Sequence, residues 1–219
     1  MRFLIGLITL FISLGSFAQH YLGLQGGWSH AQVQRKGYEY YEPSDGLTFG
    51  GFYQYRLEQF TAKSVLGFQQ KGYSQALIFV DEAGNVLGEG DIETNRFRYM
   101  YFSQLVGVNF GDKLNFSFLV GPSEYLYLGT HVTLDDVTLD NGDLLPGYNL
   151  RVNNLTRFDL SATVELGLSY EFNEHNIVQL IANYNHGLTR VGFSTYPELE
   201  RFRNHTFTVQ VGFRRHLRD

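Results

Sequence analysis

Four polar residues in the C-terminal third of the chain are of the types that form a hydrolytic site. His186, Ser194 and His205 fall near the ends of two predicted strands, and Asp159 or another carboxylate could orient one histidine. One kind of enzyme that would use such a group is a membrane β-barrel that modifies lipid A, with the catalytic residues at one end of its strands. No matching motif surrounds these residues, so polar rim residues are the simpler interpretation. We therefore predict no catalytic site.

A second candidate is an acidic stretch that could offer hard oxygen ligands to Ca²⁺. Its spacing is not that of an EF-hand, and the seven histidines of the chain are scattered, so we interpret the stretch as a solvated loop and expect neither a metal nor a cofactor. The absence of cysteine excludes disulfides and thiolate sites. The acidic stretch comprises Asp135, Asp136, Asp140, Asn141, Gly142 and Asp143.

Charged residues also occur within the predicted strands. A basic residue that faced lipid would cost about 2–4 kcal/mol at the bilayer midplane, so we expect these side chains to point into a barrel lumen. There they would form a structural network of ion pairs. The alternative is a proton or solute path through Glu124 and Glu165, which needs a continuous water channel. The predicted lumenal residues are Lys71, Arg98, Glu124, Arg157, Asp159, Glu165 and Glu171.

The elements that position these residues are strands with one apolar and one polar face. From Arg157 to Phe172 every second residue is apolar or aromatic, and none of the intervening residues is a large apolar one. A period of two over this distance predicts a strand of about 50 Å, longer than most strands of globular proteins. A tilted transmembrane strand with an extension beyond the bilayer would account for the length.

The same pattern recurs often enough to predict eight strands. Their joins alternate between short turns and long polar stretches near 30–46, 78–95, 131–155 and 188–202, as in an outer-membrane barrel with brief periplasmic turns. An even strand number places both termini in the periplasm. The predicted strands lie near 20–29, 47–57, 61–77, 96–110, 113–130, 156–172, 176–187 and 203–215.

Two details of the pattern concern aromatic residues. Between 96 and 110 the alternation changes phase, from which we predict a bulge near 102–104. Aromatic residues gather near the strand ends and predict one belt at each membrane interface. The belt away from the periplasm would contain Tyr99, Tyr101, Tyr125, Tyr127, Tyr184 and Phe207, and the periplasmic belt Tyr53, Tyr55, Phe110, Tyr170, Phe172 and Phe213.

The N-terminus predicts export. Arg2, an apolar run over 3–14 and small residues up to Ala18 form a signal peptide over 1–19, and the apolar run is too short for a spanning helix. Residues 20–219 then form a single domain. The net charge of the whole chain is −5, and no basic patch indicates nucleic acid. A soluble ligand-binding barrel would also alternate, but its apolar face would point inward.

Short segments along the chain are similar to one known family. Residues 67–72 read Gly-Phe-Gln-Gln-Lys-Gly, 118–122 read Phe-Leu-Val-Gly-Pro, and 167–172 read Gly-Leu-Ser-Tyr-Glu-Phe. In their order and spacing they resemble the PorT-type outer-membrane β-barrel family of Bacteroidota. The chain departs from it at 99–102, Tyr-Met-Tyr-Phe, where the family usually has Leu-Glu-Ile-Pro. The resemblance implies an eight-stranded outer-membrane barrel, and some relatives serve secretion of gliding or protease cargo.

From these observations we expect an all-β, eight-stranded antiparallel transmembrane barrel, monomeric, non-enzymatic and surrounded by outer-membrane lipid. Its long outer loops would bind an envelope protein or a surface glycan, because rigid scaffolds usually carry recognition on loops. An accessory role in a secretion or gliding system is one form of this hypothesis. Candidate loop contacts are Tyr38, Tyr40, Tyr41 and Tyr148.

Overall fold

The computed structural model describes residues 19–34, 41–81, 83–140, 142–152, 157–192 and 201–217. Every regular element in these ranges is a β-strand. No helix long and apolar enough to cross a membrane occurs among them. Residues 1–18 of the predicted signal peptide, the candidate loop contacts Tyr38 and Tyr40, Ser194 and Asn141 lie outside the described residues.

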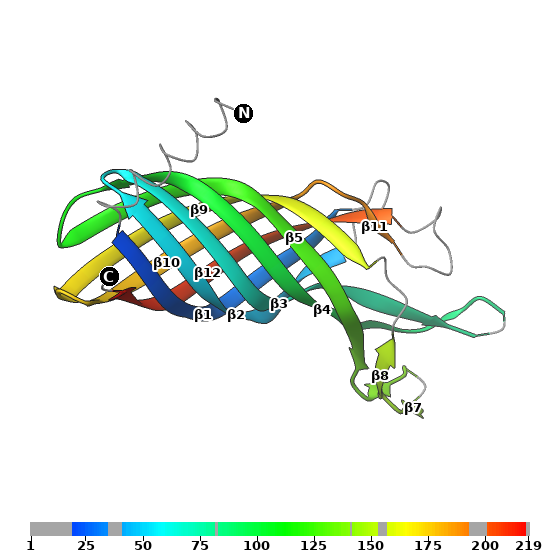
Figure 1. The fold of residues 1–219 in the computed structure, drawn as a ribbon. Coiled ribbons are helices and arrows are strands. Elements are labelled where there is room, and N and C mark those ends of the chain that lie inside the picture. The colour runs from blue at the N-terminus through cyan, green and yellow to red at the C-terminus, as the bar shows by residue number, and fades with distance from the viewer. Residues whose placement is uncertain are drawn as a thin grey trace, which may run out of the picture.

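Eight long antiparallel strands form a closed barrel, as the sequence predicted. Neighbouring strands pair in chain order, and pairing of the last with the first closes the sheet. Because His20 pairs with Leu217, the first and last described strands begin and end at the same end of the barrel (Figure 1). The barrel strands are β1 (Gln19–Gln34), β2 (Tyr41–Leu57), β3 (Phe60–Val80), β4 (Val86–Phe110), β5 (Leu114–Leu134), β9 (Phe158–Asn173), β10 (Asn176–Gly187) and β12 (Arg201–Leu217).

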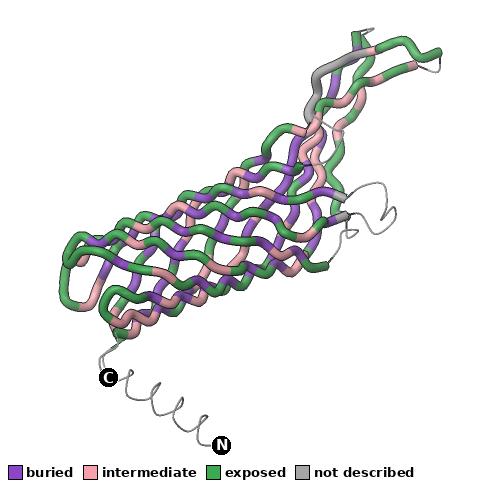
Figure 2. Tube along the Cα trace, turned by 90° about the horizontal axis from the view of Figure 1, so that it is seen from above, coloured by how far each residue is buried: buried purple, intermediate pink, exposed green. Residues whose placement is uncertain are grey.

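The wall of the barrel has an apolar outside and a polar inside. In β9, Leu166 is 56% exposed on the outer face, whereas its neighbour Glu165 is 3% exposed on the inner face. Figure 2 shows this alternation of buried and exposed residues along strands of the barrel wall. The soluble-barrel alternative requires the reverse orientation, so the structure argues against it.

Short turns join the strands at one end, as predicted, at 58–59, 111–113 and 174–175. The predicted long loop over 78–95 is wrong, because β3 and β4 remain paired up to Val80 and Val86. Asp81 closes this hairpin: its carboxylate accepts hydrogen bonds from the Asn85 side chain and from the backbone amides of Asn85 and Ala83. These hydrogen bonds lower the pKa of Asp81.

At the other end the strands continue beyond the barrel on one side only. The ends of β3, β4 and β5, together with β8 (Tyr148–Val152), form a sheet that we call the projection (Figures 1 and 2). A small core of Leu134, Val137 and Leu139 packs there against Leu77 and Phe79. The remaining short strands are β6 (Val137–Thr138), β7 (Leu144–Leu145) and β11 (Val191–Gly192).

The predicted bulge near 102–104 is not present. The register of β4 against β5 is continuous from Tyr99 to Phe110, and its shift lies between Arg98 and Tyr99. Phe97, Tyr99 and Tyr101 are buried in the lumen, whereas Val106, Val108 and Phe110 face outward. The change of phase in the sequence therefore marks aromatic side chains on the inner face and not a bend in the strand.

Candidate functional site

A buried ion pair lies in the lumen toward the end with the long connections. Lys71 Nζ is 3.3 Å from Asp159 Oδ2, and both side chains are fully buried. The Asp159 carboxylate also accepts hydrogen bonds from Asn204 Nδ2 at 3.0 Å and Thr189 Oγ1 at 2.9 Å. Strands β3, β9 and β12 thus meet at one carboxylate whose two oxygens both have donors.

Aromatic rings surround this ion pair and fill the lumen beside it. Lys71 Nζ lies 3.2 Å from the centre of the Tyr125 ring, a cation–π contact in a desolvated site. Phe97 and Phe202 stack with their centroids 5.6 Å apart, and Tyr73 packs edge-on against both. We call these four rings, Tyr73, Phe97, Tyr125 and Phe202, the aromatic plug. They are at most 5% exposed, so they close the lumen on this side.

A second buried ion pair lies nearer the short turns, and the sequence did not predict it. Lys63 Nζ contacts both oxygens of Glu165, at 2.7 and 3.0 Å, and lies 4.6 Å from the centre of the Phe52 ring. Lys63 occupies an odd position of β3, the same parity as Lys71. That shared parity could have indicated that Lys63 also faces the lumen. The alternation of apolar and polar residues is weak around Lys63, however, because its outward neighbours Ala62 and Ser64 are small.

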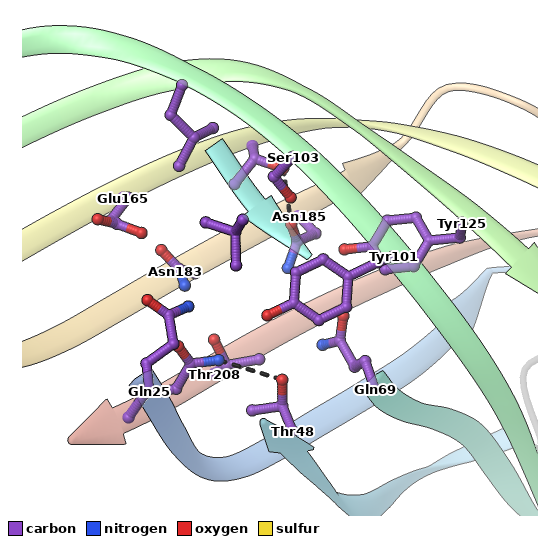
Figure 3. Close-up of a pocket in the computed structure, with 14 residues that line it drawn as sticks. Gln25, Thr48, Gln69, Tyr101, Ser103, Tyr125, Glu165, Asn183, Asn185 and Thr208 are labelled. Atoms are coloured by element: carbon purple, nitrogen blue, oxygen red, sulfur yellow. Dashed lines mark hydrogen bonds between the residues drawn. The ribbon is translucent and has the colours of Figure 1, made fainter. Parts of the chain in front are cut away.

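Between the two ion pairs the lumen is polar and narrow. The hydroxyl groups of Ser103, Ser123 and Thr163 form a chain of hydrogen bonds of 2.6 and 2.5 Å that ends on the Asn185 amide oxygen at 2.7 Å. The cavity beside them, shown in Figure 3, has a volume of about 20 Å³. A cavity of this size holds about one water molecule, so the predicted alternative of a solute path finds no continuous channel here.

The seven predicted lumenal residues do not all face the lumen. Lys71, Asp159 and Glu165 do, and Glu171 faces inward at the short-turn mouth beside Arg56 and Lys113. Arg157 is exposed at a bend just before β9.

Arg98 and Glu124 are corrections to that prediction. Arg98 alternates with the buried Phe97 and Tyr99, and Glu124 with the buried Ser123 and Tyr125, so both point outward. Both lie beyond the middle of the barrel toward the long connections, where an outward charge can reach water or lipid headgroups instead of hydrocarbon.

The candidate hydrolytic group is not assembled among the described residues. The rings of His186 and His205 are 4.6 Å apart, but both lie on the outer wall, where His205 Nε2 is 3.2 Å from Gln34 Oε1. Asp159 is on the inner face, bound to Lys71. A carboxylate on the opposite face of the wall cannot orient either histidine.

The described acidic residues form no metal site, since no group of three or more potential ligands occurs in the part of the chain that the structure describes.

The two described tyrosines that were predicted as loop contacts differ in how far they are available to a partner. Tyr41 packs inward on Tyr73 with ring centroids 4.4 Å apart. Tyr148, 36% exposed on β8, donates its hydroxyl to Glu93. Partial burial and the Glu93 carboxylate raise the pKa of Tyr148 to about 12.

The outer belt of aromatic residues is also only partly where it was predicted. Tyr184 and Phe207 face outward, but Tyr99, Tyr101 and Tyr125 lie in the lumen. At the short-turn end, by contrast, the predicted residues with outward exposure of 41–55% are Tyr53, Phe110, Tyr170, Phe172 and Phe213.

No family model and no curated protein matches the chain. Solved structures of outer-membrane β-barrels are similar to it at low identity. OprG from Pseudomonas aeruginosa is 9% identical over 91% of this chain and 97% of its own, with a TM-score of 0.48. Neisserial surface protein A is 12% identical over 91% and 99%, with a TM-score of 0.47. Ail of Yersinia pestis is 14% identical over 90% and 99%, with a TM-score of 0.42. The PorT-type resemblance stays a prediction.

Proposed function

We propose that this chain is an integral protein of the bacterial outer membrane, non-enzymatic and non-conducting, whose projection binds a partner at the cell surface. The observation that carries the proposal is the polarity of the barrel wall. Large apolar side chains such as Leu24, at 70% exposure, cover its outside, while Lys63, Lys71 and their carboxylate partners are buried inside. Such a surface is stable in lipid and unfavourable in water.

The height of the apolar band supports this location. On β4 the outward residues are apolar from Phe110 to Met100 except at Gln104. Ten residues of a strand tilted by about 40° rise roughly 25 Å, the height of the apolar band of such barrels. The short turns and both described chain ends would then face the periplasm, which implies an export signal in the N-terminal segment.

The function we propose lies outside the lumen. Two ion pairs, the aromatic plug and a cavity of about 20 Å³ between the ion pairs support a lumen that is closed to solutes. Beyond the barrel, however, the projection exposes apolar side chains that neither lipid nor the small core covers. Ile78 is 62% exposed, Val80 57% and Leu150 52%. Exposed apolar residues outside the membrane band are typical of a contact surface.

The partner would be another envelope protein or a surface glycan. An accessory role in a secretion or gliding system is the form that the family resemblance suggests. The closed sheet leaves no free barrel edge to pair with a second copy, so we propose that the barrel itself is monomeric.

The test has two stages. Heated and unheated samples of purified outer membranes are compared on a gel. A faster band in the unheated sample is the expected result, and a soluble periplasmic protein without a heat shift would overturn the proposal. A photo-crosslinking residue is then placed at Ile78 or, as a matched control, at the lipid-facing Leu166. Discrete adducts with an envelope protein or glycan are expected from Ile78 and not from Leu166, and identical patterns from the two sites would refute the role of the projection.

A further inference from the structure

Four cationic or titratable side chains gather on the outer wall where β4, β5 and β8 meet. Arg96 pairs directly with His131, and His131 with Arg151. Residues paired in this way lie on the same face of a sheet with their Cβ atoms about 5 Å apart. Arg98 lies two residues along β4 and has Nη2 3.4 Å from His131 Nδ1. We call these four residues the arginine cluster.

The arginine cluster has no anionic partner within the described structure. Ion pairs among the described residues involve Lys63, Lys71 and His30, and none involves Arg96, Arg98 or Arg151. Glu124, the carboxylate on the outer wall of β5, is paired in register with Phe102. Phe102 is four residues from Arg98 along β4, about 13 Å. Three guanidinium groups therefore share one face, and no described carboxylate neutralises them.

The position of the cluster is the boundary of the apolar band. Met100, the outward residue that follows Arg98 on β4, is 42% exposed, and Phe102 after it is 39% exposed. In the orientation proposed above, the cluster would lie at the depth of the lipid headgroups of the outer leaflet. A polar interface is also where arginine side chains are tolerated on the lipid-facing wall.

Next to the arginine cluster, on the side toward β1, β2 and β3, the outer wall is hollowed. The hollow has a volume of about 510 Å³ and is lined almost entirely by apolar atoms, including those of Leu66, Met100 and Leu128. It exists because Gly51, on the outer face of β2, has no side chain there, while Phe49 and Phe68 stack at 5.2 Å beside it. Met100 and Leu128 connect it to the cluster, since they adjoin Arg98 and its register partner Gly129.

We propose that the arginine cluster and the hollow together bind one phosphate-bearing lipid of the outer leaflet, an inference that rests on the proposed membrane location. The guanidinium groups bind the phosphate oxygens in bidentate geometry, and an acyl chain fills the hollow. A phosphate recognised alone would not need the hollow, and an acyl chain alone would not need three arginines without a described carboxylate partner. Their continuity on one wall points to a molecule that has both.

The experiment measures lipid retention by native mass spectrometry on the full mature chain, refolded in detergent. The probes are dioleoyl phosphatidic acid and dioleoyl phosphatidylcholine, which share their acyl chains. We expect wild-type protein to retain phosphatidic acid about tenfold more strongly, roughly the effect of one additional charge-assisted hydrogen bond. The double variant Arg98→Gln/Arg151→Gln should lose this preference. Arg203→Gln, at an exposed arginine of β12 on another part of the wall, is the matched control and should keep it.

A second variant tests the acyl half of the site. A Cβ placed on Gly51 would meet its nearest atoms at 3.8 Å, so Gly51→Phe fills the hollow without a backbone clash. We expect this variant to retain both lipids several-fold less, while its heat-shifted gel band stays normal. If Gly51→Phe has no effect and inorganic phosphate displaces phosphatidic acid at equal concentration, the cluster is a free-anion site and the lipid proposal is overturned.

The remaining outcomes separate this inference from the proposed function. A protein that inserts into vesicles of phosphatidylcholine and shows the heat shift, yet retains the two lipids equally, defeats the lipid site alone. Equal retention by wild-type protein and Arg98→Gln/Arg151→Gln has the same meaning. A protein that neither inserts nor shows the heat shift defeats the membrane location and the lipid site with it.

Discussion

The ion pair between Lys71 and Asp159 offers the sharpest test of how the lumen is stabilised. Both side chains are fully buried, so removal of one partner leaves the other charge without its counterion in a site that water does not reach. Loss of one member of a buried pair costs about 3–5 kcal/mol, whereas replacement of both by apolar residues of similar volume is often nearly neutral. The two single changes should not cost the same.

The geometry predicts which change is worse. In Lys71→Met the Asp159 carboxylate keeps the hydrogen bonds from Asn204 and Thr189, so we expect a loss near the lower limit, about 3 kcal/mol. In Asp159→Asn the Lys71 ammonium loses its counterion and keeps a neutral amide oxygen and its contacts with aromatic rings such as Tyr125, so we expect a loss near about 5 kcal/mol. The double variant Lys71→Met/Asp159→Leu leaves no buried charge, but Asn204 and Thr189 lose their acceptor, so we expect a loss of only about 1–3 kcal/mol, far below the sum of the two single losses.

The assay is unfolding by urea in phospholipid vesicles. Trp28, the single tryptophan of the chain, is 41% exposed on the outer wall, and its fluorescence reports transfer from lipid to water. The heat-shifted gel band gives an independent measure of the folded fraction. Strictly additive losses in the double variant, or a larger loss for Lys71→Met than for Asp159→Asn, would refute the reasoning. The first result would mean that the two charges do not interact, and the second that the ring contacts outweigh the hydrogen bonds.

Three further outcomes are expected. In the same vesicles Leu166→Arg should cost about 2–4 kcal/mol and Tyr170→Arg, nearer the short-turn interface, at most about 1 kcal/mol, and equal small costs would contradict the membrane location. Wild-type protein in a planar bilayer should give no steady ion conductance, and stable open steps would contradict the closed lumen. Tyr148 should ionise near pH 12, so its contribution to holding β8 is complete below about pH 10 and is lost as the pH rises through 12. The difference in alkaline absorbance between wild-type protein and Tyr148→Phe measures this, and it should move to lower pH in Glu93→Gln.

The number and order of the strands could be predicted because a barrel wall repeats every two residues. In β9 each side chain meets either hydrocarbon or the lumen, so nearly every residue from 157 to 172 carries information about the face on which it lies. The hairpin between β3 and β4 was harder to predict from the sequence. Beyond the membrane both faces of a strand meet water or a small core, as at Ile78 and Phe79, and the strict alternation that marks a spanning strand is lost.

The contents of the lumen could be predicted only in part. An aromatic residue suits both a membrane belt and a lumenal plug, so Tyr99 and Tyr125 could not be assigned from their type alone. The cost of placing a charged side chain on the lipid-facing side falls near the membrane interface. Charge alone therefore does not show which face Arg98 and Glu124 occupy, and both were predicted on the wrong face. The partner of Lys71 is 88 residues away along the chain, a distance over which a single sequence carries no pairing information.

The aromatic plug also bears on where the protein meets its surroundings. Tyr73 of the plug is continuous along β3 with Leu77 and Phe79, which pack in the small core of the projection. Tyr41 joins the plug from β2 and holds the first strand pair against it. The projection is therefore an extension of the interior of the barrel and not a loop attached to its rim. A surface that is held from beneath in this way loses little conformational entropy when it binds, which favours recognition on the projection over passage through the lumen.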